Sequence, residues 1–295
     1  MHEVDIMGTG QKFGGPWTVE KLSILSDYLN FYTTALKNQP FQLIYIDAFA
    51  GTGKINIGNE DEYEVIDGSA RLALQASGQF AEYIFIEKKK SFAKELEEMV
   101  RQEFSQQAFK VKIMNEDCNQ ALISICQKVN WKNNRAVLFL DPYAADVRWE
   151  TLSEVAATKA IDVWYLFPFS AANRLMKKTG EIDPTWREKL NSIFGDNSWE
   201  TQFYEESPQM DLFNEVPKER VVSTESLKKY IEARLHTIFP AVSPNSRILS
   251  NRKNSPLFLF CFAVASKRPK AIGLAMNVAD YILKDKKPSS GRKEK

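Results

Sequence analysis

A glycine-containing turn after an apolar run is the segment of this sequence best suited to bind a nucleoside. Residues 43–46 form the apolar, β-rich run that is typical of a parallel strand buried on both faces. Asp47 follows this run, and Phe49, Gly51 and Gly53 come after it at alternate positions. Glycine lets the backbone turn tightly and lets a ligand lie against bare main chain. The strand, the turn and the carboxylate together predict a site for a nucleoside cofactor.

Two phosphate-binding interpretations of this turn do not fit its spacing. A phosphate-binding P-loop needs a glycine and a Ser or Thr at the positions that Ala48 and Ile55 occupy. A dinucleotide fingerprint needs its last glycine where Asn56 stands. A nucleotide-phosphate hydrolase therefore rests only on the pair Gly53 and Lys54, and it stays an open alternative.

The remaining pattern, D-x-F-x-G-x-G, resembles the first motif of S-adenosylmethionine-dependent methyltransferases. The variant with Phe at the first glycine position is frequent among the members that methylate amino groups of nucleic-acid bases. The resemblance implies that Asp47, Phe49, Gly51 and Gly53 line a site for S-adenosylmethionine.

An acidic residue ends the next apolar run. Glu87 stands in FIEKK, where a carboxylate of a nucleoside-binding α/β fold accepts hydrogen bonds from the ribose hydroxyls. It lies forty positions after Asp47, about twice the usual spacing, which we attribute to a loop insertion over residues 55–67. A surface glutamate at the end of a strand is the alternative.

A third acidic residue follows the third apolar run, in NEDCNQ. Asp117 is placed to accept a hydrogen bond from the adenine amino group, with the backbone of Cys118 meeting a ring nitrogen. Asp117 or Asn119 would equally well cap the helix expected from Gln120 onward. Both roles are compatible.

The fourth run ends in LDPYAADVRW, which resembles the catalytic D-P-P-Y motif of amino-methyltransferases. In that motif a carboxylate and a backbone carbonyl accept hydrogen bonds from a planar amino group, and the aromatic ring stacks on the base. The resemblance gives these roles to Asp141, Pro142 and Tyr143. The second proline of the motif is missing here, so the stacking geometry expected for adenine or cytosine does not carry over directly. A plain turn after a strand is the alternative.

Composition excludes several other chemistries. The chain has 295 residues and a net charge of +1, which does not favour a strongly electrostatic nucleic-acid binder. Cys118, Cys126 and Cys261 are too few and too scattered for a disulfide framework or a zinc site, and only His2 and His236 are present, so we expect no metal. The sequence begins without the apolar core of a signal peptide and has no apolar run long enough to span a bilayer, so we expect a cytoplasmic protein with no membrane contact.

Strand-like and helix-like segments alternate through the first half of the chain. A helix is expected at residues 17–36, where Lys21 is placed to reach a cofactor carboxylate or a phosphate. Strands are expected at residues 83–87, 109–114, 136–140 and 161–169, separated by helical patterns at 69–76, 91–104, 120–129 and 149–158. This alternation predicts an α/β fold with a doubly wound, mostly parallel, Rossmann-like sheet.

The rest of the chain follows a different pattern, so we divide it into four parts. We expect an N-terminal helical segment (1–39), a Rossmann-like core (40–170 and 255–284), a mainly helical insertion that caps the substrate or a partner (171–254), and a basic disordered tail (285–295). The insertion is expected over the edge of the sheet that binds ligands.

The motifs taken together resemble the three-Cys-motif partner protein family. The similarity covers WTVEKLSILSDYL, YIDAFAGTGK, DGSARLAL, FIEKK, NEDCN, LDPYAADVRWETL and LFLFCFAVAS, and it is weakest over residues 171–254. It implies a bacterial, class I methyltransferase-like domain and a protein partner that carries three cysteines.

Two functions follow from this sequence. The first is an S-adenosylmethionine-dependent methyltransferase that modifies a nitrogen of a planar acceptor, most simply a base of RNA or DNA. The second is a catalytically silent, methyltransferase-like module that binds a nucleoside or serves as a scaffold for a protein partner. The missing proline and the low net charge favour the second.

Overall fold

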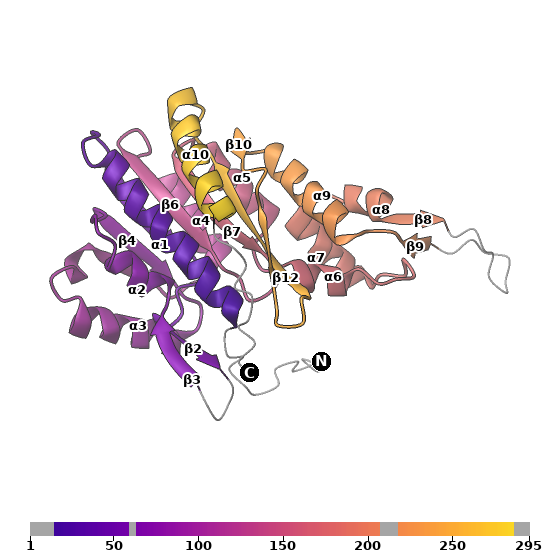
Figure 1. Ribbon diagram of the computed structural model, residues 1–295, viewed down its shortest axis with the longest axis horizontal. Helices are drawn as coiled ribbons and strands as arrows, with labels where there is room; N and C mark the ends of the chain where they lie inside the picture. The colour runs from indigo at the N-terminus through magenta and orange to yellow at the C-terminus, as the bar shows by residue number, and fades with distance from the viewer. Residues whose placement is uncertain (1–14, 59–62, 207–217, 286–295) are drawn as a thin grey trace.

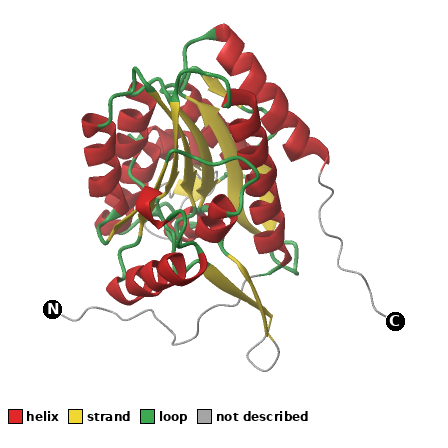
Figure 2. Ribbon diagram, turned by 90° about the vertical axis from the view of Figure 1, so that its left-hand side faces the viewer, coloured by secondary structure: helices red, strands yellow, loops and turns green. Residues whose placement is uncertain are grey.

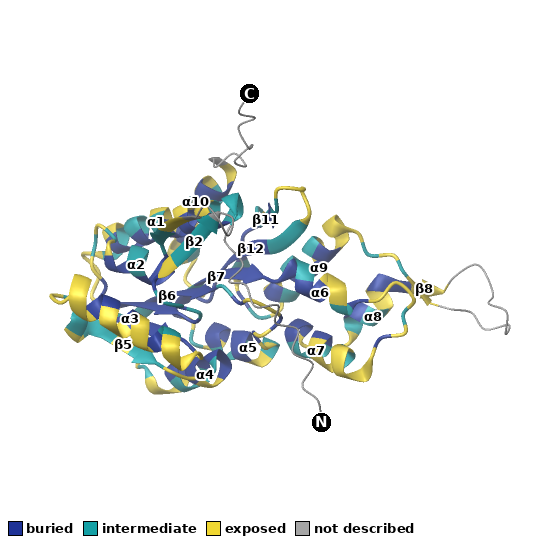
Figure 3. Ribbon diagram, turned by 90° about the horizontal axis from the view of Figure 1, so that it is seen from below, coloured by how far each residue is buried: buried dark blue, intermediate teal, exposed yellow. Residues whose placement is uncertain are grey.

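A central sheet lies between two layers of helices in the computed structural model (Figure 2). The structure describes residues 15–58, 63–206 and 218–285. The strands of the sheet are buried, and the outer faces of the flanking helices are exposed (Figure 3). Of the helices in these three ranges, none combines the length and the apolar character needed to cross a bilayer.

The parallel strands follow the Rossmann order. In chain order they are β1 (Gln42–Asp47), β4 (Glu82–Ile86), β5 (Val111–Met114), β6 (Asn134–Leu140) and β7 (Ile161–Phe167). In the sheet they run β5-β4-β1-β6-β7, which is the order 3-2-1-4-5 of a doubly wound sheet. The antiparallel strand β12 (Pro256–Val264) follows β7 and pairs with β10 (Ala241–Val242) and β11 (Arg247–Ser250). The fold class expected from the sequence is confirmed.

Residues 43–46 of β1 are all apolar because both faces of this strand are buried. Ile44 and Ile46 belong to the core on one face of the sheet, and Leu43 and Tyr45 belong to the core on the other. Its register aligns Asp47 with the ends of both neighbouring strands, β4 and β6. The connections from β1 and β6 leave on opposite sides, so the topological switch point lies between them.

Four helices cover the face that carries Tyr45 (Figure 1): α1 (Pro16–Leu36), α2 (Ser69–Leu74), α3 (Lys90–Glu103) and α10 (Pro269–Asp285). The other face is covered by α4 (Cys118–Lys128), α5 (Trp149–Ala157), α6 (Phe169–Leu175), α7 (Pro184–Phe194), α8 (Ser198–Phe203) and α9 (Thr224–His236). The helices expected from spacing alone are present with small shifts at their ends. The third strand starts at Val111 because a 3-10 turn, η1 (Ala108–Lys110), precedes it.

Residues 171–254, expected as a mainly helical insertion, also include two strands of the main sheet. The insertion contains α6 to α9 and the short pair β8 (Tyr204–Glu206) and β9 (Lys218–Arg220), but β10 and β11 belong to the main sheet. Its aromatic side chains, such as Phe194 and Tyr230, lie in the same core as the sheet residues. The helical part therefore ends before Ala241 and shares a core with the sheet.

The loop expected over residues 55–67 forms a hairpin, β2 (Lys54–Gly58) with β3 (Tyr63–Asp67). Arg71 anchors it by pairing with Asp67 and with Glu103 of α3. The hairpin projects from the sheet on the side away from β8 and β9 (Figure 1). Residues 286–295 of the tail expected to be disordered lie outside the described residues, and Asp285 ends α10.

Candidate functional site

The four acidic residues singled out in the sequence lie after four neighbouring strands. Asp47 ends β1, Glu87 follows β4, Asp117 follows β5 and Asp141 follows β6. Because these strands are parallel, their carboxyl ends meet at one edge of the sheet, where open α/β sheets bind ligands. Asp47 and Asp141 flank the switch point between β1 and β6.

Asp47 is a buried carboxylate with several donors around it. It is completely buried and accepts hydrogen bonds from the Phe49 backbone N–H (3.2 Å), the Tyr45 hydroxyl (3.3 Å) and the hydroxyl of Ser69. Burial raises its pKa to about 6, and the nearby charge of Asp141 acts in the same direction. The hydrogen bonds oppose this rise without cancelling it, so Asp47 changes charge near neutral pH.

Asp141 forms an ion pair with Lys21 of α1. Lys21 is only 4% exposed, and its Nζ also lies 4.9 Å from the centre of the Trp17 ring. The Asp141 side chain is 20% exposed. The sequence expectation gave Lys21 to a ligand carboxylate or phosphate, but in the structure its ammonium group pairs with Asp141. Helix α1, far from Asp141 in the sequence, therefore contributes Lys21 to the site.

Glu87 joins the tip of β4 to the glycine turn. One carboxylate oxygen accepts the backbone N–H of Gly51 at 3.0 Å, and the other accepts that of Lys89 at 2.7 Å. Glu87 is buried, and the Asn115 side chain holds its backbone carbonyl at 2.8 Å. A surface role is thus wrong. A carboxylate has about four acceptor positions, so two bonds leave capacity for further donors.

The two glycines of the turn serve different purposes. Gly51 has a φ of +60°, and nothing lies within 4 Å of the position that a Cβ would occupy. Gly53 has a φ of +81°, and a Cβ there would lie 2.6 Å from the Cε of Met99 on α3. Open space therefore borders the backbone at Gly51, whereas the end of the Met99 side chain lies against the backbone at Gly53.

Asp117 caps helix α4 and holds its neighbour Asn119. Its carboxylate accepts the Asn119 backbone N–H at 3.0 Å and lies 3.3 Å from the Lys88 ammonium. Partial burial would raise the pKa of Asp117, but the hydrogen bonds from Asn119 and Lys88 outweigh it and hold the pKa below its usual value. The capping role is confirmed. Cys118 is buried, and burial together with Asp117 raises the pKa of its thiol to about 12, so it stays protonated.

Asn119 links this helix to the loop that carries Asp141. Its side-chain amide donates to the carbonyl of Asp146 (3.0 Å), and its oxygen accepts from the Arg148 backbone N–H (2.9 Å) and the Thr151 hydroxyl (2.8 Å). Sequence reasoning considered Asn119 only as a cap. Asn119 is buried on the first turn of α4, and nothing in the sequence indicated this burial.

Tyr143 projects from the loop after β6. Pro142 is buried, whereas Tyr143 is 79% exposed. The surrounding protein and then the charges of Asp141, Glu87 and Asp47 raise the pKa of its phenol above its usual value. The phenol therefore lies close enough to three of the site carboxylates to sense their charges, and its ring is accessible to a planar molecule.

Comparison with solved structures yields distant matches. The sequence matches no protein-family model and no curated protein sequence. The Legionella pneumophila protein LPL1258, of the family DUF519, is 11% identical with a TM-score of 0.46, over 92% of this chain and 93% of that one.

Two further structural matches belong to transferases. The methyltransferase domain of a bacterial CtHen1 protein is 9% identical with a TM-score of 0.37, over 82% of this chain and 98% of that one. Spermidine synthase from Thermotoga maritima is 11% identical with a TM-score of 0.38, over 87% of this chain and 62% of that one. At these identities and TM-scores the assignment of the fold rests on the strand order.

Proposed function

We propose that this protein is an S-adenosylmethionine-dependent methyltransferase that acts on an amino nitrogen of a nucleic-acid base. The excess of negative charge beside bare backbone carries this proposal. Asp47 and Glu87 are buried and Asp141 is partly buried, all three lie at the ends of neighbouring parallel strands, and Lys21 pairs with only one of them. A ligand that combines a cationic centre with a nucleoside fits such a site, because its charge offsets the cost of ionising Asp47.

The residues of the glycine turn fit this cofactor. The open space beside Gly51 accommodates a ligand against the main chain, as the glycine turn of a nucleoside site requires. Glu87 has acceptor positions for ribose hydroxyls, and Asp117 with the Cys118 backbone is assigned to the adenine ring. S-adenosylmethionine would supply an electrophilic methyl group there.

The acceptor is assigned to the loop after β6. Asp141 accepts a hydrogen bond from the planar amino group through the carboxylate capacity that Lys21 leaves, together with the Pro142 carbonyl. Tyr143 stacks on the base, a contact worth about 1–3 kcal/mol. These residues accelerate transfer mainly by aligning the nitrogen with the methyl carbon.

Incubation with labelled S-adenosylmethionine and separate pools of RNA, DNA and protein tests this function. We expect label in a nucleic-acid pool and none after Asp141→Ala, which should keep its affinity for S-adenosylmethionine within about threefold. Labelled protein alone would contradict the choice of acceptor. Loss of cofactor binding in Asp141→Ala would show that this residue serves binding or folding.

A catalytically silent module is the second candidate, and the ion pair between Lys21 and Asp141 favours it. This pair engages the carboxylate that an acceptor needs, and the motif also lacks its second proline. Such a module would bind the cofactor without turnover and act through a protein partner, as the resemblance to the three-Cys-motif partner family suggests. Saturable calorimetric binding with no labelled product in any pool would favour it.

A further inference from the structure

The outer edge of β5 is open. This strand pairs with β4 on one side, and no strand among the described residues pairs with its other side. The strands β1, β6 and β7 are almost wholly buried, whereas Val111, Ile113 and Met114 are only partly buried. Figure 3 shows β5 at the rim of the sheet with this intermediate exposure. An open edge is a template for pairing with another extended segment.

The register identifies which backbone groups face outward. The Met114 carbonyl accepts the N–H of Glu87 at 3.0 Å, so the backbone of Met114 faces β4. Alternate residues of a parallel strand face opposite neighbours, so the N–H and C=O of Ile113 face away from the sheet. These two groups are available to an added strand.

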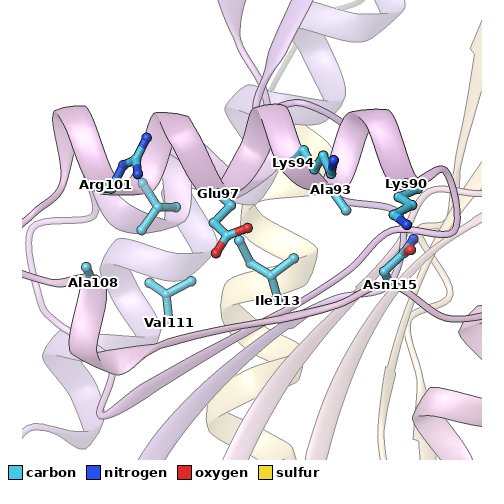
Figure 4. Close-up of a pocket in the computed structure, with 10 residues that line it drawn as sticks. Lys90, Ala93, Lys94, Glu97, Arg101, Ala108, Val111, Ile113 and Asn115 are labelled. Carbon is cyan, nitrogen blue, oxygen red and sulfur yellow. The ribbon is translucent and has the colours of Figure 1, made fainter.

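A groove runs beside this edge, between β5 and helix α3 (Figure 4). It is a cavity of about 440 Å³, and Figure 4 shows Val111 and Ile113 on one side of it. Ala93 and Val100 of α3 line the other side. A second cavity of about 360 Å³ borders the opposite face of the same strand. An extended peptide on this edge would place alternate side chains in the two cavities.

The rim of the groove is basic. Lys90, Lys94 and Arg101 lie along α3 on the side that lines the cavity, against a single acidic residue, Glu97. None of the three cations pairs with a carboxylate in the described part of the chain. Phe109, directly before β5, is 82% exposed and offers an aromatic contact at one end of the edge.

We propose that the β5 edge and the α3–β5 groove bind an extended, acidic peptide segment of a partner protein by strand addition. Main-chain bonds to Ile113 would supply affinity, and the basic rim would select acidic side chains. A second copy of this chain is disfavoured, because pairing of two such edges brings basic rims and Lys112 side chains together. This proposal does not depend on the proposed enzymatic activity.

Labelled peptides test the proposal on the full chain. The probe is an end-capped eight-residue peptide of alternating glutamate and valine, and the control peptide carries lysine in place of glutamate. Fluorescence anisotropy should show saturable binding of the acidic peptide and at least tenfold weaker binding of the basic one. Equal affinity for the two peptides, or no binding of the acidic one at millimolar concentration, would overturn the proposal.

Variants separate the backbone contact from the charged rim. Ile113→Pro removes the outward N–H without removing a bond to β4, so it should abolish binding. Its melting temperature should fall only by the cost of the lost, partly buried side chain, as Ile113→Ala, which keeps the N–H and should still bind, would show. Lys94→Glu with Arg101→Glu should weaken binding at least fivefold. The matched reversal Lys267→Glu with Lys270→Glu, on the exposed surface at the start of α10, should leave it within twofold. Equal effects of the two reversals would refute a role for the rim.

Amide exchange gives a readout that does not require a variant. The acidic peptide should slow exchange of the Ile113 amide at least tenfold and leave the Met114 amide, already bonded to β4, unchanged. An unchanged Ile113 amide in a saturated complex would place the peptide elsewhere and contradict strand addition.

Discussion

The preference for S-adenosylmethionine over S-adenosylhomocysteine should increase as pH rises, because Asp47 ionises over this range. With a pKa of about 6, Asp47 is ionised in about 9% of molecules at pH 5 and about 91% at pH 7. The two ligands differ at the sulfur, which is cationic only in S-adenosylmethionine. If the sulfonium binds only the ionised form, its affinity relative to the neutral analogue rises about tenfold across these two pH units.

Isothermal titration of both ligands at several pH values measures this preference. The ligands share their amino and carboxyl groups, so the effect of titrating these groups on the two dissociation constants cancels in their ratio. Asp47→Asn is the control, since its side chain has no charge to lose, and its ratio should stay flat. A wild-type ratio that does not change between pH 5 and pH 7, or one that changes equally in Asp47→Asn, would refute the role of Asp47.

Further substitutions test individual contacts. Protonated Asp47 contributes stability that is lost as pH rises from about 4 through about 6. Over this range the unfolding free energy of the wild type, relative to that of Asp47→Asn, should therefore fall by about 3 kcal/mol, as measured by urea denaturation. Lys21→Met should lower the unfolding free energy by about 3 kcal/mol, since it leaves the Asp141 charge without its partner. The double variant with Asp141→Asn should recover most of this loss. Additive losses would show that the two side chains do not stabilise each other. Gly53→Ala should destabilise by about 1–2 kcal/mol because its backbone is left-handed, with a further loss if the end of the Met99 side chain cannot move aside. Gly51→Ala should cost about 1 kcal/mol for the same backbone reason and mainly weaken cofactor binding in calorimetry. Tyr143→Ala should weaken binding of the base by about 1–3 kcal/mol in an oligonucleotide titration and leave thermal stability unchanged; a lower melting temperature would show a structural role.

The order of the acidic residues along the sheet edge was predictable from the sequence. Parallel strands end at the same edge, so an acid after each of four apolar runs has to lie near the next one. Asp47 and Glu87 demonstrate this, since each follows its strand as expected and lies in the site. The alternation of strands and helices in the sequence predicted the fold class, because each such unit adds a parallel strand to the sheet.

The contacts across the chain were not predictable from local patterns. The pairing of Lys21 with Asp141 joins residues 120 positions apart, and nothing in either segment specifies it. The different roles of Gly51 and Gly53 depend on the position of Met99 on α3. The strand β10 is only two residues long, a single period of the alternation that identifies strands, so its membership of the main sheet was not predictable from sequence.

A crystal structure of the protein with S-adenosylhomocysteine tests the central claim most directly. We predict that the adenosine lies across the carboxyl ends of β1, β4 and β5, with its ribose hydroxyls on Glu87 and its chain against the backbone of Gly51. A ligand found in the α3–β5 groove, or no ligand at the carboxyl ends of β1, β4 and β5 at millimolar concentration, would contradict the account.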